Sequence, residues 1–259
     1  LATGVLPLCF GEATKFSQFL LDADKRYQAT FKLGVITDSG DADGKVLETR
    51  AVPEISDSKL ESVLEKYRGE ISQIPSMFSA LKVNGQPLYK LARQGIEIER
   101  KSRQVTIHEL AVLERHQDKV TVDVHCTKGT YVRTLAEDIG LELGCGAHVV
   151  ELRRLAAGPY TIDEAVSMEQ LEALAEDKAQ LDAKLQPVSS AVQDWPQVEL
   201  TEVTASYIRQ GQPVQIANAP TTGWVSIFSE SDDPNEEFIG VGEVTDDGRI
   251  APRRLVVTN

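Results

Sequence analysis

The sequence lacks the features that mark membrane, disulfide-rich and metal-binding proteins. Its 259 residues contain no apolar run near the roughly 20 residues that a membrane span needs. Cysteine is scarce, and Cys9, Cys126 and Cys145 lie far apart without a C-x-x-C pair. We therefore expect reduced thiols and no structural zinc, because disulfide and zinc sites need suitably spaced cysteines. The printed sequence begins with neither Met nor a basic segment, and we interpret it as part of a longer or processed chain.

Positive charge is also scarce, since 27 Lys and Arg residues face 40 Asp and Glu residues and give a net charge of −13. The acidic residues are concentrated in two stretches, 161–202 and 228–248, each with a net charge of −8, which leaves about +3 for the rest. Segment 82–103 holds six basic and two acidic residues. Local patches rather than net charge bind phosphate groups. The charge pattern alone favours a solvated mixed surface, with a phosphate-binding segment as the alternative.

Hydrophobic periodicity predicts an α+β region followed by a small β region. Residues 26–33 alternate polar and apolar side chains, which predicts a half-buried strand. Further strands are predicted near residues 103–114, 119–126 and 151–155, and helices near 12–21, 58–67, 86–94, 130–143 and 163–185. After Pro187, short β-like pieces alternate with turn residues, so we place a domain boundary near 186–196.

The stretch 37–44 reads T-D-S-G-D-A-D-G and imitates a calcium-binding loop. Such a loop needs a bidentate glutamate at its twelfth position, which here is Arg50. We therefore predict a turn between two strands. Ser58 and Glu61 have the spacing of a capping box and predict where the following helix begins.

Several ordered blocks resemble the bacterial TruB family of tRNA pseudouridine synthases. The blocks are L-A-T-G-V-L-P (1–7), G-E-A-T-K (11–15), D-K-R-Y (24–27), Q-I-P-S-M-F-S-A-L-K (73–82), K-G-T-Y-V-R-T (128–134) and G-C-G-A-H (144–148) with L-R-R-L (152–155). Residues from about 196 onward are similar to the PUA-like domain of the same family. The blocks extend over essentially the whole chain, so the resemblance is more specific than any single short motif.

The resemblance implies an α+β fold class, namely a pseudouridine synthase fold with a mixed, largely antiparallel sheet, followed by a small all-β PUA-like domain. We expect an N-terminally truncated catalytic domain at 1–186 and the PUA-like domain at 196–259. The implied activity is that of an isomerase (an intramolecular transferase) that converts uridine 55 in the T-loop of tRNA to pseudouridine. The reaction exchanges an N-glycosidic bond for a C–C bond to the same sugar. It requires neither a redox cofactor nor a metal, and we expect none.

The resemblance also implies catalytic residues. The family nucleophile is an Asp in a block G-x-L-D-P-x-A-T-G, of which the printed sequence contains only the end, so the Asp is expected two positions before Leu1. We therefore predict that the 259 residues alone are catalytically inactive. Tyr27 matches the tyrosine that lies against the target base and takes part in proton transfer, and Arg133 matches the arginine that pairs with the Asp. An aromatic ring suits an unstacked base, and a guanidinium holds a carboxylate in bidentate geometry.

Substrate-binding positions follow from the same resemblance. Tyr27, Tyr131 and Leu152 match positions that line the pocket of the target base. The residues proposed to contact phosphate groups are Lys15, Lys82, Arg93 and Arg154. In the C-terminal region, the basic cluster that could contact RNA consists of Arg249, Arg253 and Arg254. Residue type alone leaves a simpler alternative open at each position, which is core packing for the tyrosines and the leucine and a solvated surface charge for the basic residues.

The expected partner is tRNA, recognised by the shape of its T arm with the target base flipped into the pocket. We expect a cytoplasmic monomer without a membrane partner. Two alternatives remain open from the sequence: a catalytically inactive tRNA-binding protein with the same surface, and an acidic protein-interaction module whose matches to the family would be accidental. A G-x-L-D-P block immediately before Leu1 would favour the enzyme over the binding protein.

Overall fold

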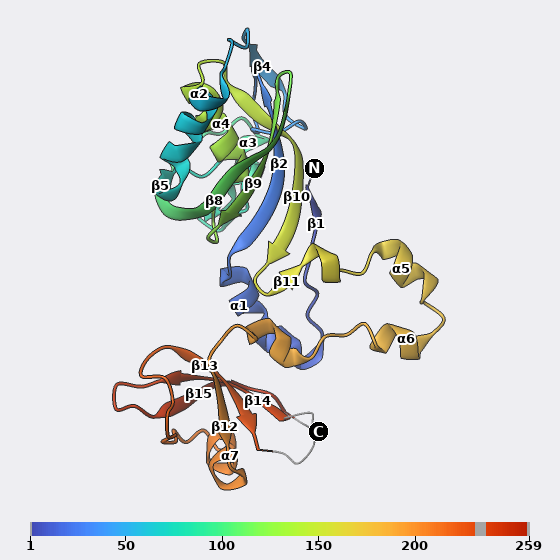
Figure 1. The fold of residues 1–259 in the computed structure, drawn as a ribbon, viewed down its shortest axis with the longest axis vertical. Helices are drawn as coiled ribbons and strands as arrows, with labels where there is room; N and C mark the ends of the chain where they lie inside the picture. Colours follow the sequence, from blue (N-terminus) through green and yellow to red (C-terminus); the bar gives the residue numbers. More distant parts are fainter. Residues whose placement is uncertain (1, 231–236, 258–259) are drawn as a thin grey trace. The chain divides into compact units, whose positions relative to one another are not determined.

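The computed structural model describes residues 2–230 and 237–257, and these divide into two compact units (Figure 1). The first unit contains residues up to 6, 23–157 and 161–163, and the second contains 7–22, 158–160 and 164 onward. Each unit has its own buried core. No helix in these described ranges is long and apolar enough to cross a membrane.

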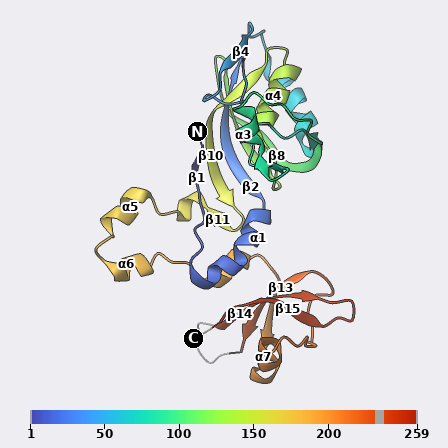
Figure 2. The same cartoon turned by 180° about the vertical axis from the view of Figure 1, so that it is seen from behind.

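A large mixed sheet forms the centre of the first unit. Its strands run in the order β1 (Ala2–Gly4), β10 (Ala147–Ala157), β2 (Lys25–Leu33), β9 (Lys119–Cys126), β8 (Arg103–His116) and β5 (Gly69–Gln73). The pair β1–β10 is parallel, and the other neighbours along this path are antiparallel. Figure 2 shows β1, β10 and β2 side by side. The prediction of a mixed, largely antiparallel sheet is confirmed.

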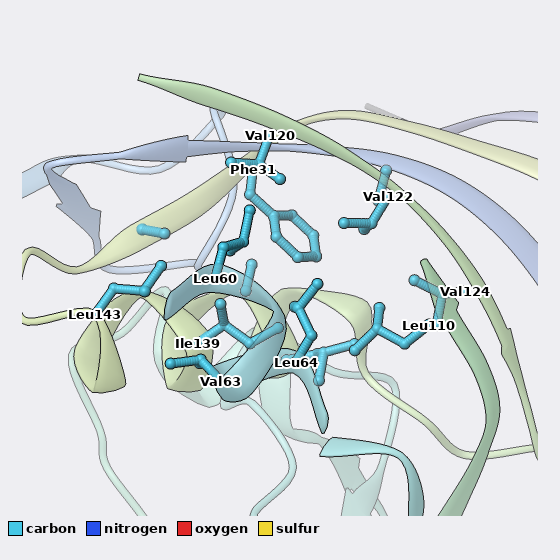
Figure 3. Close-up of a cluster of buried hydrophobic side chains, with 14 of the residues drawn as sticks. Phe31, Leu60, Val63, Leu64, Leu110, Val120, Val122, Val124, Ile139 and Leu143 are labelled. Atoms are coloured by element: carbon cyan, nitrogen blue, oxygen red, sulfur yellow. The ribbon is translucent and has the colours of Figure 1, made fainter. Parts of the chain in front are cut away.

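Alternation along the strands explains why one face of this sheet is buried. Ala29, Phe31 and Leu33 of β2 lie in the core, and so do Val120, Val122 and Val124 of β9. The core is completed by two helices, α2 (Asp57–Leu64) and α4 (Val132–Glu142), which pack against the same face (Figure 3). Burial of a side chain such as Phe31 stabilises the fold by about 1.5–3 kcal/mol.

The predicted helix at 58–67 is present, but the predicted cap is wrong. The N-cap of α2 is Ser56, two residues before the expected Ser58, because the hydroxyl of Ser56 accepts a hydrogen bond from the backbone N–H of Lys59 at 3.2 Å. A 3₁₀ turn, η2 (Glu65–Tyr67), extends the helix. Ser58 lies inside the first turn, where its hydroxyl contacts that of Ser56.

Two small hairpins and a short helix project from the large sheet. The stretch 37–44 is a turn between β3 (Val35–Thr37) and β4 (Val46–Thr49), as predicted. A second hairpin, β6 (Lys82–Val83) with β7 (Gln86–Pro87), leads into α3 (Leu88–Ala92). Met77, Leu88 and Leu91 form a small separate core at the β6–β7 hairpin and α3.

The second unit contains a four-stranded sheet, in agreement with the small β domain predicted there. The sheet order is β12 (Gln197–Leu200), β13 (Trp224–Ser229), β14 (Glu237–Val244) and β15 (Ile250–Leu255). Its other elements are η1 (Gly11–Phe16), α1 (Ser17–Asp22), α5 (Met168–Ala173), α6 (Lys178–Asp182), η4 (Val188–Val192) and α7 (Glu202–Arg209). The short β11 (Tyr160–Thr161) and η3 (Ile162–Glu164) lie where the chain passes between the units.

Two features of the second unit differ from the sequence-based expectation. The acidic stretch 163–185 forms two short helices, α5 and α6, without a buried side chain, rather than one amphipathic helix. The helix α7 was not predicted, although Thr201 caps it and Ala205 and Ile208 are buried. Its eight residues are too few for a clear periodic signal. Part of the acidic stretch 228–248, residues 231–236, lies outside the described residues.

Candidate active site

Three of the predicted site residues lie on one face of adjacent strands. Tyr27 on β2 pairs with Arg154 on β10, and Leu152 on β10 pairs with Ala29 on β2. Directly paired residues of antiparallel strands point to the same side of a sheet. Tyr27 and Leu152 are half-buried and pack against the main core. The structure therefore brings Tyr27, Leu152 and Arg154 together at the side of the sheet that the helices cover.

Arg154 is more constrained than a surface phosphate contact would be. Its side chain is half-buried, and Nε donates a hydrogen bond to the carbonyl oxygen of Val5 at 2.6 Å. Its neighbour Arg153 is exposed. Burial raises the pKa of the Tyr27 hydroxyl, the nearby Cys126 thiol raises it further, and the Arg154 guanidinium lowers it.

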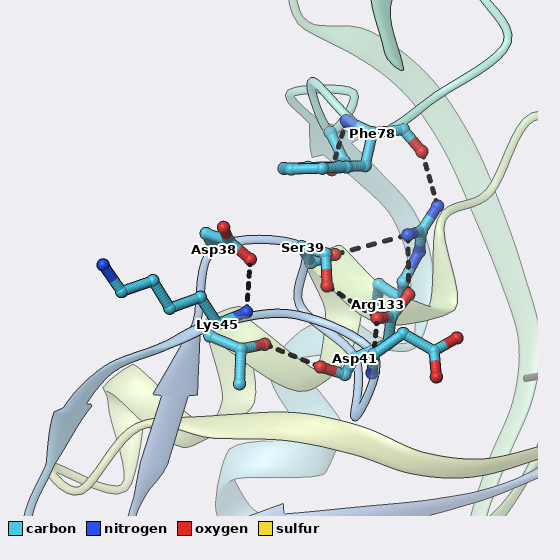
Figure 4. A network of polar contacts seen from close by, with 9 residues as sticks. Asp38, Ser39, Asp41, Lys45, Phe78 and Arg133 are labelled. Atoms are coloured by element: carbon cyan, nitrogen blue, oxygen red, sulfur yellow. Dashed lines mark hydrogen bonds and ion pairs between the residues drawn. The ribbon is translucent and has the colours of Figure 1, made fainter. Parts of the chain in front are cut away.

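Arg133 is the centre of a polar network at the beginning of α4 (Figure 4). Its Nη1 donates to the Asp41 carboxylate at 2.8 Å and to the Ser39 carbonyl oxygen at 3.3 Å. Its Nη2 donates to the carbonyl oxygen of Phe78 at 2.8 Å. The side chains of Arg133 and Asp41 are 24% and 11% exposed, so this ion pair is screened far less than a surface pair.

The loop between β3 and β4 holds the Asp41 carboxylate in place. Its Oδ1 accepts hydrogen bonds from the Ser39 hydroxyl at 2.6 Å and from the Asp43 backbone N–H at 3.2 Å. The hydroxyl of Thr37 donates to the Asp41 carbonyl oxygen at 2.9 Å. The sequence predicted only a turn here, and so it missed Asp41. The density of Asp and Ser in 37–44 was the available signal, because such side chains often bond to nearby backbone groups.

Glu137 is a second residue that the sequence did not single out. It follows Arg133 by one turn of α4, and its Oε1 is 2.7 Å from where a Cβ on Gly40 would lie. Burial raises the pKa of the Glu137 carboxyl to about 7, and Asp138 and Asp41 contribute in the same direction. The positive charges of Arg133 and Arg100 partly oppose this rise. The i, i+4 spacing of Arg133 and Glu137 was a signal for their proximity.

Gln73 fixes the backbone of the predicted pocket residue Tyr131. The Gln73 side chain is buried, with 2% exposure, at the end of β5. Its Oε1 accepts from the Tyr131 N–H at 3.0 Å, and its Nε2 donates to the Tyr131 carbonyl oxygen at 3.3 Å. Tyr131 itself is half-buried and is the N-cap residue of α4, two positions before Arg133. Gln73 thus orients the residue at which α4 begins.

The remaining basic candidates occupy different surroundings. Lys82 and Arg93 are exposed in the segment around β6, β7 and α3, where Arg93 lies 5.6 Å from the centre of the Tyr89 ring. Lys15 belongs to the second unit and is engaged there, with Glu12 at 2.6 Å and the Leu255 carbonyl oxygen at 3.0 Å. The structure therefore does not group Lys15 with the residues of the first unit.

Among residues 2–230 and 237–257, no group of three or more His, Cys, Asp or Glu side chains could hold a metal ion. The cysteines described are free thiols, and burial raises the pKa of Cys126 to about 11. A thiol with that pKa remains protonated at neutral pH and is a poor nucleophile.

Three family models match successive parts of the chain. The model described as "TruB family pseudouridylate synthase (N terminal domain)" matches residues 1–132. The "tRNA pseudouridylate synthase B C-terminal domain" matches residues 133–193, and "Pseudouridine synthase II TruB, C-terminal" matches residues 196–256.

Similar proteins from several bacteria carry the name tRNA pseudouridine synthase B. That of Ectopseudomonas mendocina (strain ymp) is 56% identical over 260 residues, which cover 100% of this chain and 83% of that protein. The protein of Serratia proteamaculans (strain 568) is 49% identical, with coverage of 99% and 83%. That of Coxiella burnetii (strain RSA 493 / Nine Mile phase I) is 52% identical, with coverage of 99% and 82%.

Solved structures share the fold. A chain of an H/ACA RNP bound to a substrate RNA containing 2'-deoxyuridine has a TM-score of 0.72 and 22% identity, covering 99% of this chain and 73% of that chain. A chain of a Cbf5-Nop10-Gar1 complex has a TM-score of 0.70 and 24% identity, covering 100% and 72%. One family model matches more than half of the sequence, and relatives about half identical to it cover nearly all of it. The chain therefore belongs to the TruB family of pseudouridine synthases.

Proposed function

We propose that this protein isomerises uridine 55 in the T-loop of tRNA to pseudouridine. One observation carries the proposal: relatives that are 49–56% identical over 99–100% of the chain are named tRNA pseudouridine synthase B. These names also give no support to the alternative of a catalytically inactive tRNA-binding protein. We also propose that the protein is a cytoplasmic monomer and that it needs neither a cofactor nor a metal for this reaction.

The reaction sets clear chemical requirements. The bond between N1 of uracil and C1′ of the sugar breaks, the base rotates in place, and a bond forms between C5 and C1′. One proton leaves C5 and one is gained at N1, so the product is an isomer of the substrate. A carboxylate must act at the sugar, and another group must move the C5 proton. The site must also hold the free base against a flat side chain, for which we propose Tyr27.

We propose that Arg133 binds the nucleophilic Asp of the G-x-L-D-P block. The strand register supports this assignment, because Ala2, Thr3 and Gly4 pair in parallel with Leu152, Arg153 and Arg154. The Asp is expected three residues before Ala2, and Val149 lies three residues before Leu152, the partner of Ala2 on β10. Val149 forms a backbone bridge with Asp41, which is the ion-pair partner of Arg133. The expected Asp and the guanidinium would thus lie near one another.

Leu152 and Tyr131 complete the proposed pocket. Leu152 is half-buried beside Ala29, so it offers an apolar surface next to Tyr27. Tyr131 is held by Gln73 at the beginning of α4. An apolar and aromatic lining suits a base that has left its stack, because stacking on such side chains is worth about 1–3 kcal/mol per base.

We propose that the T arm is bound mainly through exposed basic residues of the first unit. Lys82 and Arg93 belong to no ion pair among the described residues, so their charges are available to phosphate groups. In the PUA-like domain, proposed at 196–259, Arg249 pairs with Asp247 and Arg253 pairs with Glu243. RNA would have to compete with these carboxylates, which makes that cluster a weaker phosphate site.

Tritium release from tRNA labelled at C5 of uridine tests the proposed function. The extended chain, which is residues 1–259 with the D-P pair added upstream, is expected to release tritium above the background without protein. Release at the level of that background would contradict the proposed function.

A further inference from the structure

Arg154 is held by Val5 through both its backbone and its side chain. The Val5 N–H donates to the Arg154 carbonyl oxygen at 2.9 Å, and Nε of Arg154 donates to the Val5 carbonyl oxygen at 2.6 Å. The neighbouring Gly4 makes this close approach possible, since a Cβ there would lie 2.1 Å from the Arg154 carbonyl oxygen. Gly4 also has a φ of +105°, which side chains with a Cβ rarely adopt. The end of β1 therefore fixes where the Arg154 guanidinium lies.

The guanidinium held in this way faces Tyr27. Arg154 and Tyr27 are direct partners across the antiparallel strands β10 and β2, so their side chains share one face of the sheet. With Nε bonded to Val5, the two terminal nitrogens remain to interact with the Tyr27 hydroxyl, whose pKa the guanidinium lowers. Arg153, the next residue along β10, is exposed and pairs with Gln28.

The surroundings of Tyr27 otherwise oppose ionisation of its hydroxyl. Burial raises its pKa, and Cys126 on β9 acts in the same direction. Cys126 acts through the negative charge of its thiolate, and burial raises the pKa of Cys126 itself to about 11. Arg154 is the positive charge that acts on Tyr27, and a guanidinium keeps its charge at every physiological pH.

We propose that Arg154 is a positioning residue for Tyr27, holding its hydroxyl in place and stabilising the phenolate oxygen that accepts the C5 proton. This inference rests on the proposed function, because it assigns a task within the isomerisation. Tyr27 first gives its hydroxyl proton to solvent, and Arg154 stabilises the phenolate that results. After the C5–C1′ bond has formed, the C5–H bond breaks, its electron pair returns to the uracil ring, the proton passes to the Tyr27 phenolate, and N1 takes up a proton from solvent. This role replaces a phosphate contact for Arg154, because a guanidinium bonded to Val5 and directed at Tyr27 has little surface left for RNA.

The first test measures the Tyr27 hydroxyl directly and needs no catalysis. In residues 1–259, 3-fluorotyrosine is placed at all six tyrosine positions and followed by ¹⁹F NMR against pH, with Tyr27 assigned by the resonance that Tyr27→Phe removes. Arg154→Gln is expected to move the titration of Tyr27 to higher pH. Arg154→Lys, which keeps the positive charge, is expected to move it by less. The matched control Arg153→Gln should leave it unchanged. An unchanged titration in folded Arg154→Gln protein would overturn the proposal.

The second test uses single-turnover rates of the extended chain across pH. Arg154→Gln should lower the rate at pH 7 about tenfold and move the rising limb of the profile to higher pH, with partial rescue by Arg154→Lys. Affinity for tRNA and its salt dependence should match those of Arg153→Gln. A weaker affinity with a smaller salt slope and an unmoved pH profile would instead make Arg154 a phosphate contact. If the unsubstituted extended chain makes no pseudouridine, the proposed function fails, while the NMR titration still decides whether Arg154 acts on Tyr27.

Discussion

Arg133 donates a hydrogen bond to the carboxylate of Asp41 at 2.8 Å, so the arginine proposed to bind the nucleophile already has one carboxylate partner. A guanidinium carries five N–H donors in a planar fork, and it can therefore hold a second carboxylate at the same time. Asp41 is in turn fixed by the loop at 37–44. We infer that this loop orients Arg133 toward the position that the nucleophile would occupy.

Arg133→Lys keeps the charge but loses the bidentate geometry. In the extended chain we expect a strong fall in the single-turnover rate, while tRNA affinity and its salt dependence barely change. For contrast, Arg93→Ala should weaken tRNA binding and reduce the salt slope by about one phosphate's worth. A rate near that of the unsubstituted chain for Arg133→Lys, with a reduced salt slope for Arg133→Ala, would make Arg133 a phosphate contact instead.

Asp41→Asn preserves the shape of the side chain and removes its charge. We expect a loss of about 1–3 kcal/mol in the free energy of unfolding, because the half-buried Arg133 loses its ion pair with Asp41. The rate of the extended chain should fall as well, since the guanidinium loses its orientation. Asp57→Asn is the matched control, because the Asp57 side chain is 98% exposed. Equal effects of the two substitutions on thermal unfolding and on rate would contradict the role given to Asp41.

Tyr27→Phe retains the aromatic ring and removes only the hydroxyl. If the oxygen accepts the C5 proton, the single-turnover rate of the extended chain should fall at least about a hundredfold, in the range typical of general acid–base catalysis. Affinity for tRNA should change little, because the stacking surface remains. Comparable rates for the two proteins would leave Tyr27 with a stacking role alone.

The raised pKa of the Glu137 carboxyl predicts that the stability of the protein depends on pH. Its pKa is raised from 4.5 to about 7, so between these values the folded protein binds a proton that the unfolded chain has lost. The free energy of unfolding should therefore fall as pH rises through this window, by about 1–2 kcal/mol after allowance for partial solvent exposure. Glu137→Gln cannot ionise and should lose less stability between pH 5 and pH 8.

The measurement for Glu137 is the thermal unfolding midpoint of residues 1–259 at pH 5 and at pH 8. The exposed Glu54 provides a matched control, because Glu54→Gln should preserve the pH dependence of the unsubstituted chain. If Glu137→Gln and Glu54→Gln respond alike to pH, the carboxyl of Glu137 does not titrate in this window.

Local patterns were sufficient to predict most of the secondary structure. Apolar and polar side chains alternate along β2 and β9 because one face of the sheet is buried. This alternation can be seen in the sequence without the structure. Several long sequence blocks that match the family, in the same order along the chain, were sufficient to predict the family. A chance match is excluded because many residues must match the family at the same time. The short helix α7 gives no clear period because it is only a few residues long. The cap at Ser56 differs from the prediction because two serines, Ser56 and Ser58, lie close enough along the chain to compete for one cap.

The sequence by itself thus determined the fold class, the family and the positions of Tyr27, Arg133 and Leu152 in recognisable blocks. The residues with which these side chains form hydrogen bonds and ion pairs were decided only by the tertiary structure. Asp41 lies 92 positions from Arg133 along the chain, and Val5 lies 149 positions from Arg154. No local pattern encodes such pairs, because strand pairing and the packing of α4 on the sheet bring them together. Charge and burial at a site depend on those distant neighbours, and so the acid–base behaviour of Tyr27 and Glu137 became visible only in the folded chain.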